Sequence, residues 1–131
     1  MNQTILVIDD DVAMCESLKD LLALEKFDCS IAGTGEKGLA LAKQNSPTLV
    51  VVDLQLPDMS GFQLCQLIKK EPSLHGVPVV MISGRFTEPA DRVQGFDLGA
   101  DEYFAKPFDP QYFVARLKNI LRTGIPKSNL N

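Results

Sequence analysis

The chain has 131 residues and a formal net charge of −4 at pH 7, from 13 basic and 17 acidic side chains. This length is typical of one domain, and it allows a full hydrophobic core without disulfides or a structural metal. Hydrophobic residues make up 45% of the chain and charged residues 23%, a balance that favours a folded globular protein over a disordered one. This net negative charge argues against binding to nucleic acid or anionic lipid through overall electrostatic attraction.

Other classes are excluded by short sequence patterns. No apolar run approaches the roughly 20 residues of a membrane-spanning helix, and the opening MNQTILVIDDD lacks the basic region of a signal peptide. The cysteines form no CxxC pair and His75 is the only histidine, which excludes a zinc site built on cysteine and histidine. We therefore expect a cytoplasmic protein in which Cys15, Cys29 and Cys65 are small buried residues.

Strand-like and helix-like segments alternate along the first third of the chain. Thr4–Ile8 is a continuous apolar and β-branched run, which predicts a buried strand, and Val12–Glu25 carries leucines at helical spacing. Residues 27–31 alternate apolar with polar side chains, as in a strand that is exposed on one side or near an edge. A helix over 36–44, opened at 34–35, follows.

The same alternation continues to the end of the chain. Leu49–Val52 and Val77–Ile82 are apolar enough to be strands buried on both faces, with a helix over 61–71 between them. Thr87 and Pro89 predict the start of a helix that ends near Gly99. The remaining elements are a short strand at 101–105 and a last helix from Asp109-Pro110 to about residue 123. We predict one domain over 1–123 and a tail, or the start of a linker, over 124–131.

Several single residues receive structural rather than functional predictions. We expect Ser60 to cap the helix that follows it and Asp11 to begin the first long helix, where a carboxylate favours the positive end of the helix dipole. Asp58 is expected to be a solvated loop or turn residue before Ser60, and His75 a surface residue. Phe86 follows Arg85 in a loop and is itself expected to be partly exposed. Four other phenylalanines are expected in the core: Phe62, Phe96, Phe104 and Phe113.

Five strands that alternate with five helices predict a doubly wound α/β fold, in which a parallel sheet is covered on both faces. In such sheets functional groups gather beyond the carboxyl ends of the strands. The residues there are Asp9-Asp10-Asp11 after the first strand, Asp53 after the third, Ser83 after the fourth and Lys106 after the fifth.

This set of side chains predicts phosphoryl chemistry. If the first and third strands are neighbours, the carboxylates converge, and two unit charges 4 Å apart repel by about 4 kcal/mol at an effective dielectric constant of 20. A divalent cation with a preference for oxygen, such as Mg²⁺, would relieve that repulsion and leave a position for a phosphate oxygen. A carboxylate can attack phosphorus to give an acyl phosphate, while Lys106 and Ser83 offer partners for the transferring oxygens.

The sequence resembles a response-regulator receiver domain over about residues 3–122. An isolated DD pair is weak support, but the ordered set of motifs after successive strands is specific. The matching segments are ILVIDDD (5–11), VVVDLQLPDMSG (50–61), VVMISG (79–84) and GADEYFAKPF (99–108). The resemblance implies the flavodoxin-like strand order 2-1-3-4-5.

The resemblance also implies a role for each acidic residue. Asp53 corresponds to the phosphoacceptor and is a metal ligand. Asp10 corresponds to a direct ligand of Mg²⁺, Asp9 to a ligand through water, and the backbone carbonyl of Gln55 to a further ligand. Mn²⁺ can take the place of Mg²⁺ in such sites.

The family's switch and phosphate-binding positions are occupied as well. Ser83 stands at the switch position, where a hydroxyl turns toward the phosphoryl group, and Tyr103 at that of the aromatic residue that swings inward with it. Lys106 corresponds to the residue that pairs with a phosphoryl oxygen, next to a cis bond to Pro107.

Variable positions of the family flank this set. Gln55 and Arg85 would border the path of water to an acyl phosphate, so they bear on the lifetime of the phosphoryl group. Gly84 stands where alanine is common, and Ser83 where threonine is also common. None of these departures puts phosphorylation in doubt.

Three other functions are possible for an α/β domain of this kind. A flavodoxin needs a loop after the first strand that binds phosphate through backbone amides, and Asp9-Asp10-Asp11 would repel that phosphate. An aspartyl-phosphate phosphohydrolase resembles a D-x-D signature, but the second residue after Asp53 is Gln55, and no insertion of the size of a cap domain is present. A receiver-like domain that works without phosphorylation is the third alternative, and such domains usually lack one of the acids or the lysine.

The resemblance finally implies a function in two-component signal transduction. A histidine kinase or a histidine phosphotransfer protein would donate the phosphoryl group, and the receiver would catalyse its own phosphorylation and slow autodephosphorylation rather than act as an enzyme on another substrate. Phosphorylation would shift a conformational equilibrium that is read at the face of the fourth helix, fifth strand and fifth helix.

We expect a monomer or a phosphorylation-dependent dimer, no direct binding of nucleic acid and no membrane insertion.

Overall fold

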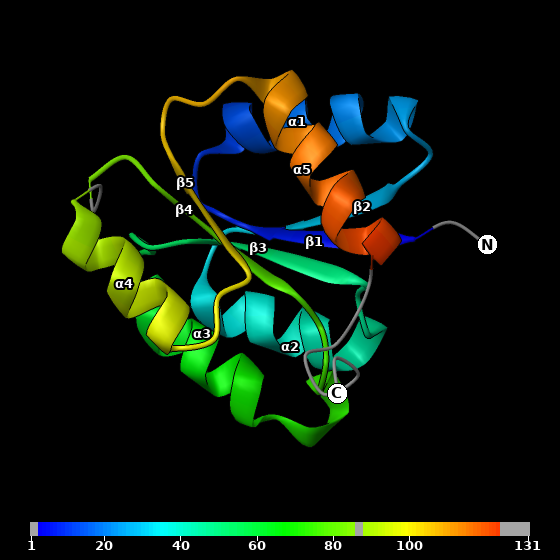
Figure 1. The fold of residues 1–131 in the computed structure, drawn as a ribbon. Helices are drawn as coiled ribbons and strands as arrows, with labels where there is room; N and C mark the ends of the chain where they lie inside the picture. The colour runs from blue at the N-terminus through cyan, green and yellow to red at the C-terminus, as the bar shows by residue number, and fades with distance from the viewer. Residues whose placement is uncertain (1–2, 86–87, 124–131) are drawn as a thin grey trace.

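A parallel sheet of five strands lies at the centre of the molecule, and helices cover both of its faces (Figure 1). The computed structural model describes residues 3–85 and 88–123. The strands are β1 (Thr4–Ile8), β2 (Asp28–Ala32), β3 (Leu49–Asp53), β4 (Val79–Ser83) and β5 (Glu102–Ala105). Their order in the sheet is β2-β1-β3-β4-β5, and every neighbouring pair is parallel. This confirms the doubly wound, flavodoxin-like architecture.

The helices divide between the two faces of the sheet. They are α1 (Val12–Leu24), α2 (Gly35–Asn45), α3 (Gly61–Lys70), α4 (Pro89–Asp97) and α5 (Pro110–Thr123), with a short 3₁₀ turn over Pro72–Leu74. Figure 1 shows α1 and α5 on one side of the sheet, and α2, α3 and α4 on the other. This arrangement follows from right-handed crossovers on either side of β1, where the winding direction reverses.

Alternation along the strands produces two separate hydrophobic cores. In β1, Ile5 and Val7 pack with the buried residues of α1 and α5, while Leu6 and Ile8 pack with those of α2 and α3. All four side chains are at most 2% exposed. Because successive side chains of a strand point to opposite faces, a strand that is covered on both sides must be apolar throughout. The uninterrupted apolar runs of the sequence are therefore explained by burial on both faces.

Polar side chains fix the starts of three helices. Oδ1 of Asp11 accepts a hydrogen bond from Met14 N–H, and the hydroxyls of Thr34 and Ser60 accept from residues three positions later in α2 and α3. Each bond satisfies a backbone donor that has no partner within the helix. The expected caps at Asp11 and Ser60 are confirmed, and Thr34 rather than Gly35 caps α2.

The fourth strand begins two residues later than the sequence suggested. Val77 is apolar, but its N–H donates to the carbonyl of Leu74, which closes the turn after the 3₁₀ segment. Pro78 has no N–H to donate to a neighbouring strand, so regular pairing starts at Val79. Local turn geometry therefore overrides the apolar pattern here.

The prediction that Phe96 lies in the core is wrong. Phe104 and Phe113 are buried and Phe62 packs against the core, but Phe96 is 45% exposed. Helix α4 turns Gly95 toward the sheet, and the next residue of a helix lies about 100° around the axis, on the outer side. Among the cysteines, Cys15 and Cys65 are buried as expected, but Cys29 on the edge strand β2 is only half-buried.

Some expectations fall on parts of the chain that remain undescribed. Phe86 and Thr87, and the proposed tail over 124–131, lie outside the described residues. His75 is exposed, as expected. None of the helices within residues 3–85 and 88–123 combines the length and the apolar character that a bilayer crossing requires.

We predict that Gly61→Ala destabilises the fold by about 1–3 kcal/mol, the usual cost of overpacking. A Cβ atom at Gly61 would lie 2.5 Å from the carbonyl oxygen of Asp53 and 2.7 Å from Cα of Leu54, and backbone atoms cannot move aside cheaply. The control is Gly33→Ala, because nothing lies within 4 Å of the Cβ it would add. Urea denaturation followed by circular dichroism measures both free energies of unfolding, and equal stabilities would contradict the close approach at Gly61.

Candidate functional site

The register of the sheet brings two carboxylates together. Ile8 of β1 lies opposite Val52 of β3, so the residues that follow, Asp9 and Asp53, come side by side at the carboxyl edge. Asp9 is 1% exposed and Asp53 is 5% exposed, whereas Asp10 is exposed to solvent. One carboxylate oxygen from each of these three residues lies within 4.8 Å of the others. The predicted convergence of acids is therefore confirmed.

Lys106 compensates part of this negative charge. It follows β5, and its Nζ donates a hydrogen bond of 2.8 Å to Oδ2 of Asp9 and lies 3.7 Å from Oδ2 of Asp53. Burial by itself lowers the pKa of Lys106, but the hydrogen bond with Asp9 and the charges of Asp9, Asp53 and Asp11 raise it on balance. The side chain is therefore a fixed positive charge at neutral pH, and it is closer to Asp9 than to the proposed phosphoacceptor.

Asp53 is the most perturbed carboxyl group of the site. Burial raises the pKa of Asp53 to about 6, and the negative charge of Asp9 adds to that rise. Two groups act in the opposite direction: the N–H of Gln55, which donates to Oδ1 of Asp53 at 3.2 Å, and the charge of Lys106. Asp9 has a similar support, because its Oδ1 accepts from Asp11 N–H at 2.9 Å. Backbone amides thus orient both buried carboxylates.

The donor set fits a hard divalent cation. Asp9, Asp10 and Asp53 supply carboxylate oxygens, which are the ligands that Mg²⁺ and Mn²⁺ prefer in proteins. One lysine cannot neutralise three carboxylates, so a bound dication would lower the electrostatic cost of the cluster. The exposure of Asp10 leaves one side of the cluster open to water and to an incoming ligand.

Ser83 lies at the same edge, next to the lysine. It is the last residue of β4, is fully buried, and its carbonyl accepts a hydrogen bond of 2.7 Å from Lys106 N–H. Its Oγ accepts from Arg85 N–H at 3.1 Å. A Cβ at Gly84 would touch only the Lys106 side chain, at 3.6 Å and beyond, so an alanine would fit there.

The remaining predicted residues lie at the rim of the site or behind it. Gln55 and Arg85 are exposed on the loops after β3 and β4. Tyr103 is only 6% exposed and belongs to the core on the side of α2 and α3. It pairs with Met81 in the sheet, two residues before Ser83, so Tyr103 and Ser83 belong to the same face. Ser83 at the edge of the site and Tyr103 in β5 therefore line the same side of the sheet.

Tyr103 is closely held by α4. A Cβ at Gly95 would lie 2.9 Å from Sδ of Met81 and 3.1 Å from Cδ2 of Tyr103, so only glycine allows this approach. The guanidinium carbon of Arg92 lies 5.9 Å from the centre of the Tyr103 ring. Burial raises the pKa of the Tyr103 hydroxyl. The close approach of Gly95 therefore couples the position of the Tyr103 ring to that of α4.

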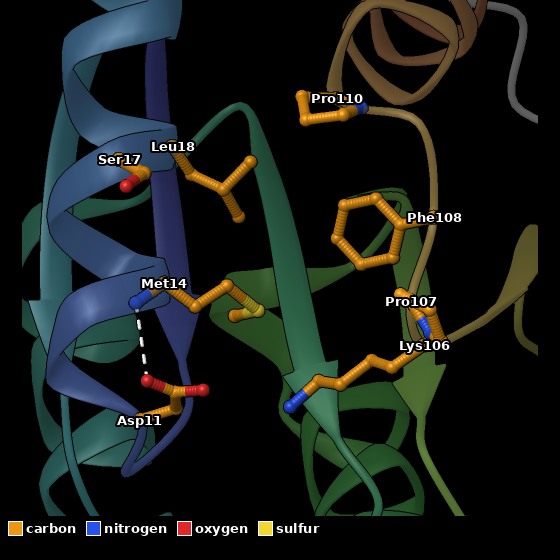
Figure 2. Close-up of a pocket in the computed structure, with 8 residues that line it drawn as sticks. All are labelled: Asp11, Met14, Ser17, Leu18, Lys106, Pro107, Phe108 and Pro110. Atoms are coloured by element: carbon orange, nitrogen blue, oxygen red, sulfur yellow. Dashed lines mark hydrogen bonds between the residues drawn. The ribbon is translucent and has the colours of Figure 1, made fainter.

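An apolar pocket of about 370 Å³ adjoins the charged edge (Figure 2). In Figure 2, Met14 and Leu18 extend from α1, and Phe108 and Lys106 extend from the opposite side, after β5. The lining residues are Asp11, Met14, Ser17, Leu18, Lys106, Pro107, Phe108 and Pro110. The bond between Lys106 and Pro107 is cis, as expected. The site thus combines charged groups at the carboxyl edge of the sheet with an apolar pocket beside them.

The sequence reasoning missed the contacts of Asp58. This exposed residue was expected to be solvated, but its two carboxylate oxygens accept hydrogen bonds from the N–H groups of Gly35 and Glu36, at 2.8 and 2.9 Å. These bonds lower the pKa of Asp58, with the bond from Glu36 as the largest cause. Nothing in the sequence around Asp58 indicates a partner more than 20 residues away. A carboxylate is nevertheless a favourable partner for the amides at the start of a helix such as α2.

The chain is similar to known proteins over almost its entire length. The family model described as "Response regulator receiver domain" matches residues 5–118. The DNA-binding response regulator MtrA of Mycobacterium tuberculosis is 40% identical over 122 residues, which cover 93% of this chain and 52% of that protein. This chain thus spans about half the length of the curated relatives it matches.

Solved structures agree. A putative response regulator from Chloroflexus aurantiacus is 33% identical with a TM-score of 0.86, covering 93% of this chain and 99% of that one. A CheY-like receiver domain protein from Methanospirillum hungatei is 31% identical with a TM-score of 0.87, covering 95% and 97% of the two chains. With the strand order, the acid cluster and the lysine already in place, the family match is decisive: the chain belongs to the response regulator receiver domain family of two-component signalling.

Proposed function

We propose that this domain accepts a phosphoryl group on Asp53 and changes conformation in response. The observation that supports this most directly is the buried Asp53 carboxylate, held between Asp9, Asp10 and Lys106 at the carboxyl edge of the sheet. Asp53 is oriented by the N–H of Gln55 through Oδ1, which leaves Oδ2 on the side of Lys106. A carboxylate oriented in this way is a suitable nucleophile.

The reaction is a transfer between two protein side chains. An oxygen of Asp53 attacks the phosphorus of a phosphohistidine whose other ring nitrogen carries a proton. The P–N bond breaks with its electron pair staying on nitrogen, the histidine leaves as neutral imidazole, and an acyl phosphate forms. Lys106 then has a new partner, because the transferred group brings anionic oxygens close to Nζ. A bound Mg²⁺ would neutralise negative charge on the transferring group. Water that attacks the phosphorus breaks its bond to the Asp53 oxygen and releases inorganic phosphate and the free carboxylate, which is the slow autodephosphorylation.

The metal would be held by residues that fit it in type. Asp10, which is exposed, is proposed as the direct carboxylate ligand beside Asp53, and Asp9, which is bonded to Lys106, as a ligand through water. The backbone carbonyl of Gln55 is the proposed further ligand. The proposed roles of Gln55 and Arg85 in the lifetime of the acyl phosphate are supported by their exposure at the rim, where their side chains can admit or shield water.

The conformational response is proposed to run from Ser83 to the face of α4, β5 and α5. The Ser83 hydroxyl accepts from Arg85 N–H in this structure and can donate to a phosphoryl oxygen once Asp53 carries one. Tyr103 then moves with α4, which holds it. Three exposed apolar side chains on α4 and α5 suit this face to a partner: Val93, Phe96 and Tyr112.

The partners follow from this scheme. A histidine kinase or histidine phosphotransfer protein is the donor, and it would approach over the apolar pocket beside Lys106. Since relatives of twice this length are named as DNA-binding regulators, an output domain or target protein that binds DNA is a candidate reader. The receiver itself, with a net charge of −4, is not proposed to bind nucleic acid. We place the domain over 1–123, in the cytoplasm, as a monomer or a phosphorylation-dependent dimer.

We predict that Asp53→Asn abolishes labelling by acetyl phosphate and Mg²⁺, because the carboxamide is nearly the same size but is not a nucleophile. Intact-mass spectrometry should show one added phosphoryl group on the wild type and none on the variant. Asp11→Asn is the matched control: Asp11 follows Asp9 and Asp10 in the chain but lies outside their cluster with Asp53 and caps α1, so this variant should still be labelled. Labelling of Asp53→Asn at the wild-type level would rule out Asp53 as the acceptor, and an unlabelled wild type would favour a receiver that works without phosphorylation.

We predict that Asp53→Asn also changes how stability depends on pH in the metal-free protein. The pKa of Asp53 is raised by folding to about 6 from an ordinary value of 3.8, so its contribution to stability is present below pH 4 and is lost as pH rises through 6. At pH 7 the variant should therefore be more stable than wild type by about 1–3 kcal/mol, and the difference should vanish near pH 4. Urea denaturation in EDTA at several pH values measures this, and a constant difference would contradict the raised pKa.

We predict that Ser83→Ala still accepts phosphate but fails to transmit it, because Asp53, Lys106 and the acids remain. A charge-assisted hydrogen bond is worth about 1.5–3 kcal/mol, which is a bias of roughly 10- to 150-fold in a two-state equilibrium. Amide NMR spectra with Mg²⁺ and beryllofluoride should show shifts over α4 and α5 in wild type and in the control Gly84→Ala, but not in Ser83→Ala. Equal shifts in all three proteins would mean that the coupling runs through Lys106.

A further inference from the structure

The segment between β3 and α3, Leu54–Ser60, carries the first residues after the proposed acceptor, and we refer to it as the acceptor loop. Its base is tied by main-chain bonds. Leu54 N–H donates to the carbonyl of Ile82, and Gly61 N–H donates to the carbonyl of Leu54 at 3.0 Å. Gln55 pairs with Ser60 as an antiparallel bridge. The two ends of the acceptor loop are therefore held close together beside Asp53.

The tip of the acceptor loop is tied to a different element, α2. Oδ1 of Asp58 accepts from Gly35 N–H at 2.8 Å, and Oδ2 accepts from Glu36 N–H at 2.9 Å. Next to it, Met59 covers Gly35, where a Cβ would lie 2.6 Å from both Cγ and Sδ of Met59. Bonds between a carboxylate and the free amides of a helix N-terminus are charge-assisted, and the helix dipole favours them.

Helix α2 does not depend on Asp58 alone for its cap. The hydroxyl of Thr34 accepts from Lys37 N–H at 3.1 Å, while the first two amides of the helix, at Gly35 and Glu36, are bound only by Asp58 among the contacts described. Two side chains thus share the start of one helix. Thr34 is local to α2, whereas Asp58 comes from the acceptor loop, so the chain itself offers a way to separate helix capping from loop anchoring.

We propose that Asp58 is a positioning residue: by anchoring the tip of the acceptor loop to α2, it holds the main chain of Gln55 in place beside Asp53. Gln55 N–H orients the Asp53 carboxylate, and Gln55 carries the carbonyl proposed as a metal ligand. Without the anchor the loop keeps the hydrogen bonds at its base and the packing of Met59, but its tip is no longer bonded to α2, so the bridge between Gln55 and Ser60 opens more often. The anchoring of the loop by Asp58 does not depend on the proposed function. Only the expected effect of Asp58 on Mg²⁺ binding and on phosphorylation rests on it.

The test compares Asp58→Ala and Asp58→Asn with Thr34→Ala. In the metal-free protein, hydrogen exchange followed by NMR should become faster at the amides of Gln55 and Gly61 in Asp58→Ala and remain as in wild type in Thr34→Ala. Calorimetric titration with Mg²⁺ should show a dissociation constant raised by about 10-fold in Asp58→Ala, the lower end of what a lost orienting partner costs a metal site. Thr34→Ala should bind Mg²⁺ as wild type does.

Asp58→Asn provides the graded case, and it remains informative if the alanine variant does not fold. Its carboxamide keeps one acceptor oxygen and replaces the other by an amino group, so it can hold one of the two amides. It should give intermediate exchange and an intermediate affinity for Mg²⁺.

The outcomes separate the two proposals. Equal weakening of Mg²⁺ binding by Thr34→Ala and Asp58→Ala would show that Asp58 acts only through the stability of α2 and would overturn the positioning role. Wild-type exchange at Gln55 in both Asp58 variants would overturn it as well. If wild type itself neither binds Mg²⁺ nor accepts phosphate, the proposed function fails, while the exchange measurement still decides whether Asp58 anchors the acceptor loop.

Discussion

The structure depends on one unfavourable contact, the approach of the Asp9 and Asp53 carboxylates at the edge of a buried sheet. Their carboxylate oxygens lie within 4.8 Å of each other. Two negative charges this close repel each other by several kcal/mol in a partly desolvated site, and the burial of both groups adds a desolvation cost. Lys106 offsets part of it, with a hydrogen bond of 2.8 Å to Asp9, and the amides of Asp11 and Gln55 bind the two carboxylates. The remaining imbalance of charge is the physical basis for the proposal that the site binds a divalent cation and accepts a phosphoryl group.

The rest of the fold keeps this contact in place. The central strands are apolar on both faces, so neither β1 nor β3 can slip by one residue without exposing one core and moving the acids off the edge. Beyond the strand ends, the loops are fixed by short polar contacts instead of by packing. Asp11 caps α1 and Ser60 caps α3. The hydrophobic layers therefore set the register, and the polar caps set the direction in which each loop leaves the sheet.

Most of the fold and of the site could be predicted from the sequence because both follow from local patterns. Apolar runs of strand length give the strands, and acids placed directly after them give the cluster. What could not be predicted depends on tertiary neighbours. Phe96 has the composition of a core residue but lies outside, because Gly95 is the side of α4 that meets Tyr103. The partners of Asp58 lie on another helix, and the preference of Lys106 for Asp9 over Asp53 depends on side-chain geometry.

The groups of the site come from segments that are far apart along the chain, at the ends of β1, β3 and β5. No fragment that lacks one of these strands can bring them together, so the charge cluster exists only when the whole sheet has formed. In an unfolded or half-formed chain the acids are dispersed and repel one another only weakly. Any ion that binds the cluster therefore binds the complete fold, and its binding free energy adds to the stability of the folded state. Ligand affinity at this edge is in that sense a readout of the integrity of the entire domain.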